Sequence, residues 1–189
     1  MSRSPRRSDT RPDGSIDPSE VAKFAAAAHA WWDPNGTFRP LHQLNPVRLA
    51  FIRDQIAALF ERDPQAPKPL GGLSVLDIGC GGGLLSEPLA RMGADVLGID
   101  AAAKSVDVAS LHARESGLSC RYRCATAEEL LAEARRFDVV LAMEVVEHVP
   151  EPSAFITTTA KLVRPGGALV LSTINRTIKA FALAVSGAE

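Results

Sequence analysis

The sequence VLDIGCGGG, residues 75–83, joins an apolar, β-branched run to a loop in which four of five residues are glycine. Glycine is needed where a ligand approaches the backbone closely or where φ is positive, and four glycines exceed the needs of a plain turn. An open α/β sheet binds its cofactor at such a turn, beyond the carboxyl end of a strand. The stretch predicts a Rossmann-like core with a ligand at Gly79–Gly83; a purely structural turn is the simpler alternative.

Downstream of Leu73, short apolar runs alternate with Ala-rich helical stretches. The pattern predicts strands near 74–78, 95–99, 120–124, 137–143 and 168–174, and helices near 84–92, 104–116, 127–134 and 152–163. This alternation implies a mostly parallel sheet with right-handed crossovers. Near-continuous apolar strands suit a sheet with helices on both faces.

We expect four segments along the chain. Residues 1–15 should form a disordered basic tail, and residues 16–61 should form an N-terminal helical lid on the substrate side. Residues 62–72 should be a linker rich in Pro and Gly, and residues 73–189 should form the Rossmann-like core. Within the lid, one helix should begin at Asp17-Pro18 and run to about Ala30. Another should begin after Asn45-Pro46, because proline disfavours a helix interior.

Composition narrows the class of protein further. The chain has 189 residues, of which 46% are hydrophobic and 23% charged, as in an ordinary soluble domain. Its net charge of −1 gives no global field that attracts nucleic acid. Three cysteines without a CxxC pair suggest a reducing compartment, and neither a signal peptide nor a membrane-spanning run is visible. We therefore expect a cytoplasmic location and no nucleic-acid partner.

The glycine loop fits a dinucleotide site poorly. Gly79 and Gly81 match the first two positions of the GxGxxG fingerprint, but the third falls on Leu84. Asp77 brings negative charge toward the loop, which disfavours a pyrophosphate and favours S-adenosyl-L-methionine, whose ammonium and sulfonium are cationic. Asp100, about 20 residues after the first glycine, can accept ribose hydroxyls of either ligand, or can cap the next helix.

These motifs together resemble class I methyltransferases, and the finer pattern is similar to the ubiquinone-biosynthesis O-methyltransferase family. The specific marks are WWD (31–33), FRPLH (38–42), NPVRL (45–49), LDIGCGGG (76–83), EVVEHVP (144–150) and STINR (172–176). The resemblance spans about residues 16–189. It implies an S-adenosyl-L-methionine-dependent enzyme that methylates phenol or catechol hydroxyls of polyprenylated ubiquinone precursors, such as 3-demethylubiquinol and 2-polyprenyl-6-hydroxyphenol.

By that resemblance, Arg48, Gly79, Asp100 and Met143 contact S-adenosyl-L-methionine. Arg48 could hold the donor's carboxylate through a charge-assisted contact, and Met143 could pack against the adenine. Without the resemblance, Arg48 would read as a solvated charge on a helix and Met143 as core filling.

Three polar residues follow the fourth expected strand: Glu144, Glu147 and His148. If this segment is helical, they share one face and could bind a divalent cation such as Mg²⁺, which the family's eukaryotic members are thought to use. His148 could instead be a general base without a metal. A third alternative makes the acids solvated and His148 a packing residue.

The resemblance also implies partners and boundaries. The substrates carry an isoprenoid tail, so we expect a peripheral contact with lipid at the inner face of the membrane, and contacts with other ubiquinone-pathway enzymes. Phe181–Val185 could lie in an amphipathic surface helix or in a buried one. The family continues for several tens of residues beyond Glu189 with two more strands, which implies that C-terminal strands are missing from this chain.

Two rival functions stay open at this point. An NAD-dependent Rossmann oxidoreductase is opposed by Asp77 and by the absent third glycine. A catalytically incomplete fragment that binds S-adenosyl-L-methionine is suggested by the position of the last residue, Glu189.

Overall fold

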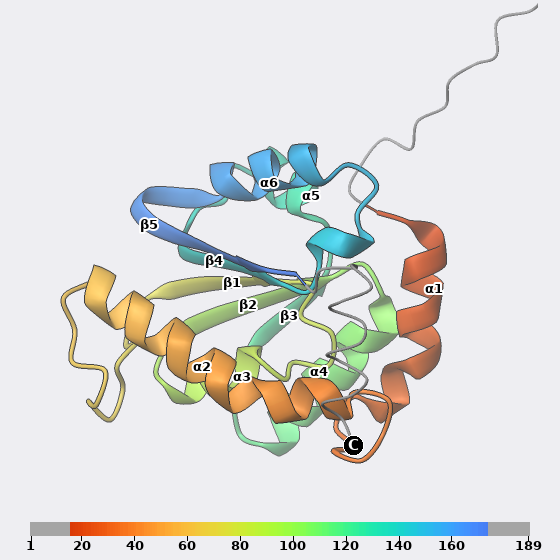
Figure 1. Ribbon diagram of the computed structural model, residues 1–189, viewed down its shortest axis with the longest axis horizontal. Helices are drawn as coiled ribbons and strands as arrows, with labels where there is room; N and C mark the ends of the chain where they lie inside the picture. Colours follow the sequence, from red (N-terminus) through yellow and green to blue (C-terminus); the bar gives the residue numbers. More distant parts are fainter. Residues whose placement is uncertain (1–15, 174–189) are drawn as a thin grey trace, which may run out of the picture.

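A computed structural model describes residues 16–173. Within them lies one five-stranded parallel sheet with the order β3-β2-β1-β4-β5 (Figure 1). The strands are β1 (Ser74–Ile78), β2 (Asp95–Asp100), β3 (Arg121–Cys124), β4 (Phe137–Met143) and β5 (Val163–Ser172). The order reverses between β1 and β4, so the sheet has its switch point where the glycine loop leaves β1.

Helices cover both faces of the sheet, and α5 and α6 lie opposite α2 and α3 (Figure 1). The helices are α1 (Pro18–Ala27), α2 (Arg39–Leu59), α3 (Ser86–Arg91), α4 (Ala103–Glu115), α5 (Ala127–Ala132) and α6 (Pro152–Lys161), with short 3₁₀ turns η1 (Ala28–Ala30) and η2 (Val146–His148). The predicted Rossmann-like α/β class with helices on both faces is therefore confirmed.

The central strands are apolar on both sides because alternate residues enter two different cores. On β4, Val140 packs with the α5 and α6 side chains, whereas Leu141 packs with those of α2 and α3. On β1, Leu76 and Val75 divide in the same way, and all four side chains are fully buried. Hydrophobic burial on both faces thus fixes the position of the carboxyl end of β1, where the glycine loop begins.

The expected start of the second helix was wrong, because α2 begins at Arg39 and continues through Pro46. Proline costs the helix one backbone hydrogen bond, about 3 kcal/mol in an interior position. Packing outweighs that loss, since Ile52 and Ile56 of the same helix are fully buried against the sheet. The first helix agrees better: Asp17 caps α1, and η1 carries the chain on to Ala30.

The last predicted strand was expected from 168, but β5 begins at Val163. The intervening Pro165-Gly166-Gly167 does not end the strand. Its register shifts between Phe137 and Val139 of β4, so the extra residues form an irregularity inside the ladder. Gly166 has φ +80°, which suits that local distortion.

Residues 62–72, expected to form a linker, contain turns and no regular element. They are nevertheless packed, because Leu70 is fully buried in the core between the sheet and α2. The Arg62 guanidinium also donates to the Gly71 carbonyl. The N-terminal tail (1–15) and Phe181–Val185 lie outside the described residues.

Candidate functional site

A cavity of about 350 Å³ lies at the carboxyl ends of β1, β2 and β4. Residues of α1 and α2 close its other side, so the N-terminal segment and the sheet share one space. All seven predicted site residues line this cavity: Arg48, Gly79, Asp100, Met143, Glu144, Glu147 and His148. The fold thus brings together residues that are up to a hundred positions apart in the sequence.

The protein itself requires part of the glycine loop's composition. Gly79 and Gly81 have φ of +70° and +53°, a region that favours glycine. A Cβ on Gly79 would come within 2.5 Å of the Val145 side chain. A Cβ on Gly81 or Gly82 would come within 2.4 Å of the Trp31 ring. Val145, just before η2, and Trp31 of the N-terminal segment therefore require part of the glycine run.

Two carboxylates face the loop from the ends of β1 and β2. Asp77 is buried and accepts a 2.5 Å hydrogen bond from Ser86 Oγ, and burial raises the pKa of its carboxyl to about 6. Asp100 accepts from the Gly81 and Ala102 backbone N–H groups at 2.9 and 2.7 Å. Burial also raises the pKa of Asp100, although these two N–H donors oppose the shift.

Arg48 forms an ion pair across the cavity with Glu144, with 2.7 Å between Nη2 and Oε1. The same oxygen accepts from Ser172 Oγ at the end of β5. Glu144 has φ +58°, an unfavourable conformation for a residue with a side chain. Its Oε2 is buried and has no hydrogen-bond partner in the described part of the chain. This pair fixes a cation and an anion beside the end of β4.

His148 contacts the N-terminal helix rather than its neighbours in the sequence. Its Nδ1 lies 2.8 Å from Glu20 Oε2, and Phe24 packs edge-on against its ring. Lys23, and then His148, hold the pKa of Glu20 below its usual range, so Glu20 is a carboxylate and Nδ1–H is the donor. With Nδ1 as donor, Nε2 of a neutral His148 is left as the proton acceptor.

The residues proposed as metal ligands do not gather into a ligand set. Glu147 and His148 lie on the η2 turn, not on a longer helix, and Glu144 precedes that turn. Glu144 Oε1 is bound by Arg48, and His148 Nδ1 by Glu20. Among residues 16–173, no group of three or more His, Cys, Asp or Glu side chains is placed to hold a metal ion. This arrangement does not fit Mg²⁺, and we derive no step through it.

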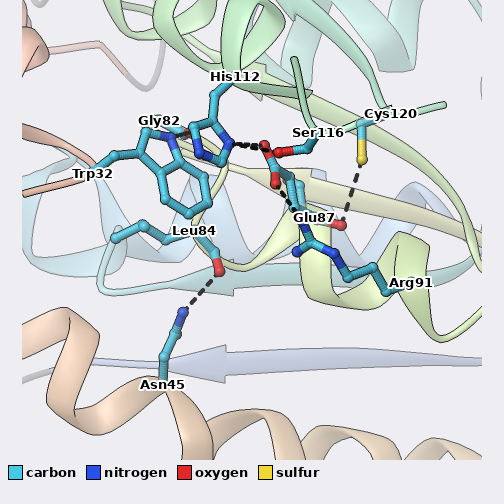
Figure 2. A network of polar contacts seen from close by, with 10 residues as sticks. Trp32, Asn45, Gly82, Leu84, Glu87, Arg91, His112, Ser116 and Cys120 are labelled. Carbon is cyan, nitrogen blue, oxygen red and sulfur yellow. Dashed lines mark hydrogen bonds and ion pairs between the residues drawn. The ribbon is translucent and has the colours of Figure 1, made fainter. Parts of the chain in front are cut away.

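The sequence did not identify several residues that line or support the cavity. Glu20 reads only as a first-turn acid, and Asn45 precedes a proline. Asn45 Nδ2 donates to the Leu84 carbonyl at 2.8 Å (Figure 2). Trp31 stacks on Phe38 with 3.7 Å between ring centroids and lines the cavity. The WWD motif was a signal for these contacts, but the sequence assigned it no role.

Comparison with known proteins agrees with this geometry. A family model described as a methyltransferase domain matches residues 76–171. Magnesium protoporphyrin IX methyltransferase from Synechocystis, solved with bound S-adenosylhomocysteine (SAH), is 28% identical with a TM-score of 0.61, over 88% of this chain and 74% of that one. The fold and the site thus define a class I S-adenosyl-L-methionine-dependent methyltransferase, and the NAD-dependent alternative is not supported.

Closer relatives identify the family. Ubiquinone biosynthesis O-methyltransferases of Cereibacter sphaeroides and Sinorhizobium fredii are 61% and 60% identical over 92% of this chain and 70% of their own length. The one from Caulobacter sp. is 59% identical over 95% of this chain and 72% of its own. The chain belongs to the ubiquinone biosynthesis O-methyltransferase family.

Proposed function

We propose that S-adenosyl-L-methionine lies along the carboxyl ends of β1, β2 and β4 in the cavity, with its amino-acid end toward Arg48 and its ribose toward Asp100. One observation carries the proposal: a cation and two buried or half-buried carboxylates line the same cavity beside the glycine loop. The donor molecule has a carboxylate, two cationic centres and a ribose, so each charge has a counterpart.

The remaining bonding capacity of these side chains supports this orientation. Arg48 uses one N–H on Glu144, and its other donors can bind the donor's carboxylate. Each oxygen of Asp100 accepts one backbone N–H and keeps a lone pair for a ribose hydroxyl. Asp77 supplies negative charge without a neighbouring cation in direct contact among the described residues. Met143, at the end of β4, provides an apolar surface for the adenine.

We also propose that His148 removes the proton of the acceptor phenol. The bound donor supplies a methyl group on a sulfonium, which is a good leaving group, so the protein must align and deprotonate the acceptor. A phenol has a pKa near 10, so a base in the site assists its deprotonation at neutral pH. Glu20 orients the imidazole through Nδ1 and leaves Nε2 to accept the proton.

Polyprenylated phenols and catechols are the acceptor class we propose, from the names of the relatives. No helix among residues 16–173 is long and apolar enough to cross a membrane. Leu44, Val47 and Phe51 are exposed on α2, the helix that also lines the cavity, which supports a peripheral contact with lipid at the inner face of the membrane. Flotation with vesicles, with and without a polyprenylated phenol, tests this location; protein that stays in the bottom fraction in both cases contradicts it.

Calorimetry with SAH tests the donor site. Asp100→Ala should abolish measurable binding, whereas Asp107→Ala, a control on α4 that does not line the cavity, should leave it unchanged. Unchanged affinity in Asp100→Ala would show that the ribose lies elsewhere. Binding of NADH instead of SAH would contradict the whole assignment.

Enzyme kinetics test the role of His148 as the base. His148→Gln should lower kcat by about 10²- to 10⁴-fold with little change in SAH affinity. If a chelator abolishes activity and His148→Gln retains it, then a metal, rather than this imidazole, activates the acceptor.

A further inference from the structure

Three side chains outside the cavity form a continuous chain of contacts that ends on the glycine loop (Figure 2). Glu87 of α3 is fully buried, and its Oε1 lies 2.6 Å from His112 Nδ1 on α4. The His112 ring stacks flat on Trp32, with 3.5 Å between centroids and 7° between planes. Trp32 Nε1–H then donates to the Gly82 carbonyl at 2.9 Å.

Each contact restricts the next one. Glu87 also pairs with Arg91 through its other oxygen, so both carboxylate oxygens are held. The bond to Nδ1 fixes the orientation of the His112 ring, and the ring plane fixes the plane of the Trp32 indole. The indole plane in turn sets the direction in which Nε1–H points at Gly82. Burying Glu87 without these partners would be costly, which indicates that the arrangement is specific.

The hydrogen bond from Trp32 reaches the part of the loop that Asp100 also holds. Asp100 Oδ2 holds the Gly81 N–H from one side, and Trp32 holds the Gly82 carbonyl from the other. The Gly81–Gly82 pair is therefore anchored at its first N–H and its last C=O. Glycine has no side chain to restrict φ and ψ, so these external anchors order the pair and, through it, the adjoining Gly79 and Cys80, which line the cavity.

We propose that Trp32 is a positioning residue for the methyl donor, held in place by His112 and Glu87. None of the three is among the described residues that line the cavity, so they act through the loop and not by contact with the ligand. The inference rests on the proposed donor site at Gly79–Gly83 and Asp100. It assigns to the second tryptophan of the WWD motif a role in donor affinity.

Calorimetry with SAH on four variants tests the proposal. Trp32→Phe keeps an aromatic ring beside His112 but removes the N–H donor together with the five-membered ring; we expect about threefold to tenfold weaker binding. His112→Ala removes both the stacking surface and the bond to Glu87 and should weaken binding similarly, whereas His112→Phe keeps the surface without that bond and should recover only part of the affinity. The control is His29→Ala, an exposed histidine on η1, with affinity unchanged.

A spectroscopic measurement on the unmodified chain completes the test. The chain has two tryptophans, so the indole N–H signal of Trp32 is identified by its loss in Trp32→Phe. That signal should shift when SAH is added, although Trp32 lies outside the cavity. A signal that does not move, or a Trp32→Phe variant that loses thermal stability but keeps wild-type affinity, would overturn the proposal.

The donor site and the positioning role of Trp32 can be tested separately. If Asp100→Ala abolishes SAH binding and Trp32→Phe binds normally, the donor site holds and the positioning role is wrong. If both variants bind SAH normally, the donor site itself is misplaced.

Discussion

The sheet and the N-terminal segment, residues 16–61, are built in different ways. The strands β1 and β4 are buried on both faces by apolar side chains that pack into two cores. Helix α1, by contrast, has no buried residue, and it and the turns before α2 are joined to the rest mainly through aromatic contacts and hydrogen bonds. Within the same segment, α2 also buries Ile52 and Ile56 against the sheet. The sheet therefore carries most of the apolar burial, whereas α1 and the turns that follow it close one side of the cavity.

The largest effect should come from emptying the core. Phe155 of α6 is almost completely buried between the helix and the sheet, and Phe155→Ala should lower the free energy of unfolding by about 3–5 kcal/mol. Phe24→Ala, on the half-buried side of α1, should cost far less stability but weaken SAH binding, because Phe24 packs on Trp31 and His148. Chemical denaturation measures the unfolding free energy of the two variants, and calorimetry measures their affinity for SAH. Equal losses of stability would contradict the difference between the two regions.

Replacement of Arg48 should have the second largest effect, because Arg48 of the N-terminal segment pairs with Glu144 at the end of β4. Arg48→Ala leaves the largely buried Glu144 without its cation, and we expect a loss of about 3 kcal/mol in unfolding free energy together with weaker SAH binding. Adding Glu144→Gln should recover part of the stability but not the affinity. If the double variant regains full affinity for SAH, Arg48 does not bind the methyl donor.

Acidification should affect donor binding through Asp77. Its folded-state pKa, about 6, lies above the ordinary value of 3.8, so the native state takes up this proton first. Its contribution to stability therefore improves as pH falls from 6 toward 4, and ionising it costs stability above 6. A cationic donor needs the ionised form, so affinity for S-adenosyl-L-methionine should fall by up to about tenfold per pH unit below 6. Asp77→Asn should bind weakly with a flatter pH profile; an unaltered profile would assign the titration to another group.

The smallest effect concerns local motion. Amide hydrogens of α1 should exchange faster than those of β1 and β4, since α1 has few buried contacts. Addition of SAH should slow exchange in α1 by closing the cavity over it, with little change in the central strands. Mass spectrometry of exchanged peptides measures both, and equal protection in the free protein would contradict the comparison.

The sequence predicts the sheet better than the lid, for a physical reason. Strands such as β4 carry their own signal, because burial on both faces demands continuous apolar residues in a short run. The path of α2 through Pro46 depends on packing of Ile52 and Ile56 against distant strands, which local preference does not contain. The strand irregularity around Gly166 is likewise set by pairing with β4.

The residues of the site also differ in how far the local sequence predicts them. Asp77 and Asp100 are predictable because strand ends place them beside the loop in any sheet of this order. The four residues taken from the family resemblance and the three polar residues expected after the fourth strand all line the cavity. Glu20 and Trp32 were not assigned roles, because their partners, His148 and Gly82, are distant in sequence and meet them only in the folded chain. The metal hypothesis depended on a longer helix after β4, where the chain forms only a short 3₁₀ turn.

The long-range contacts of the N-terminal segment also determine the order of events during folding. Residues 16–61 are synthesised before all of their partners: Arg48 meets Glu144 across 96 positions, and Glu20 meets His148 across 128. Such contacts close large loops and form slowly. On the ribosome, the segment must therefore wait until β4 has been made and paired. The ability to bind the methyl donor should accordingly be one of the last properties that the nascent chain acquires.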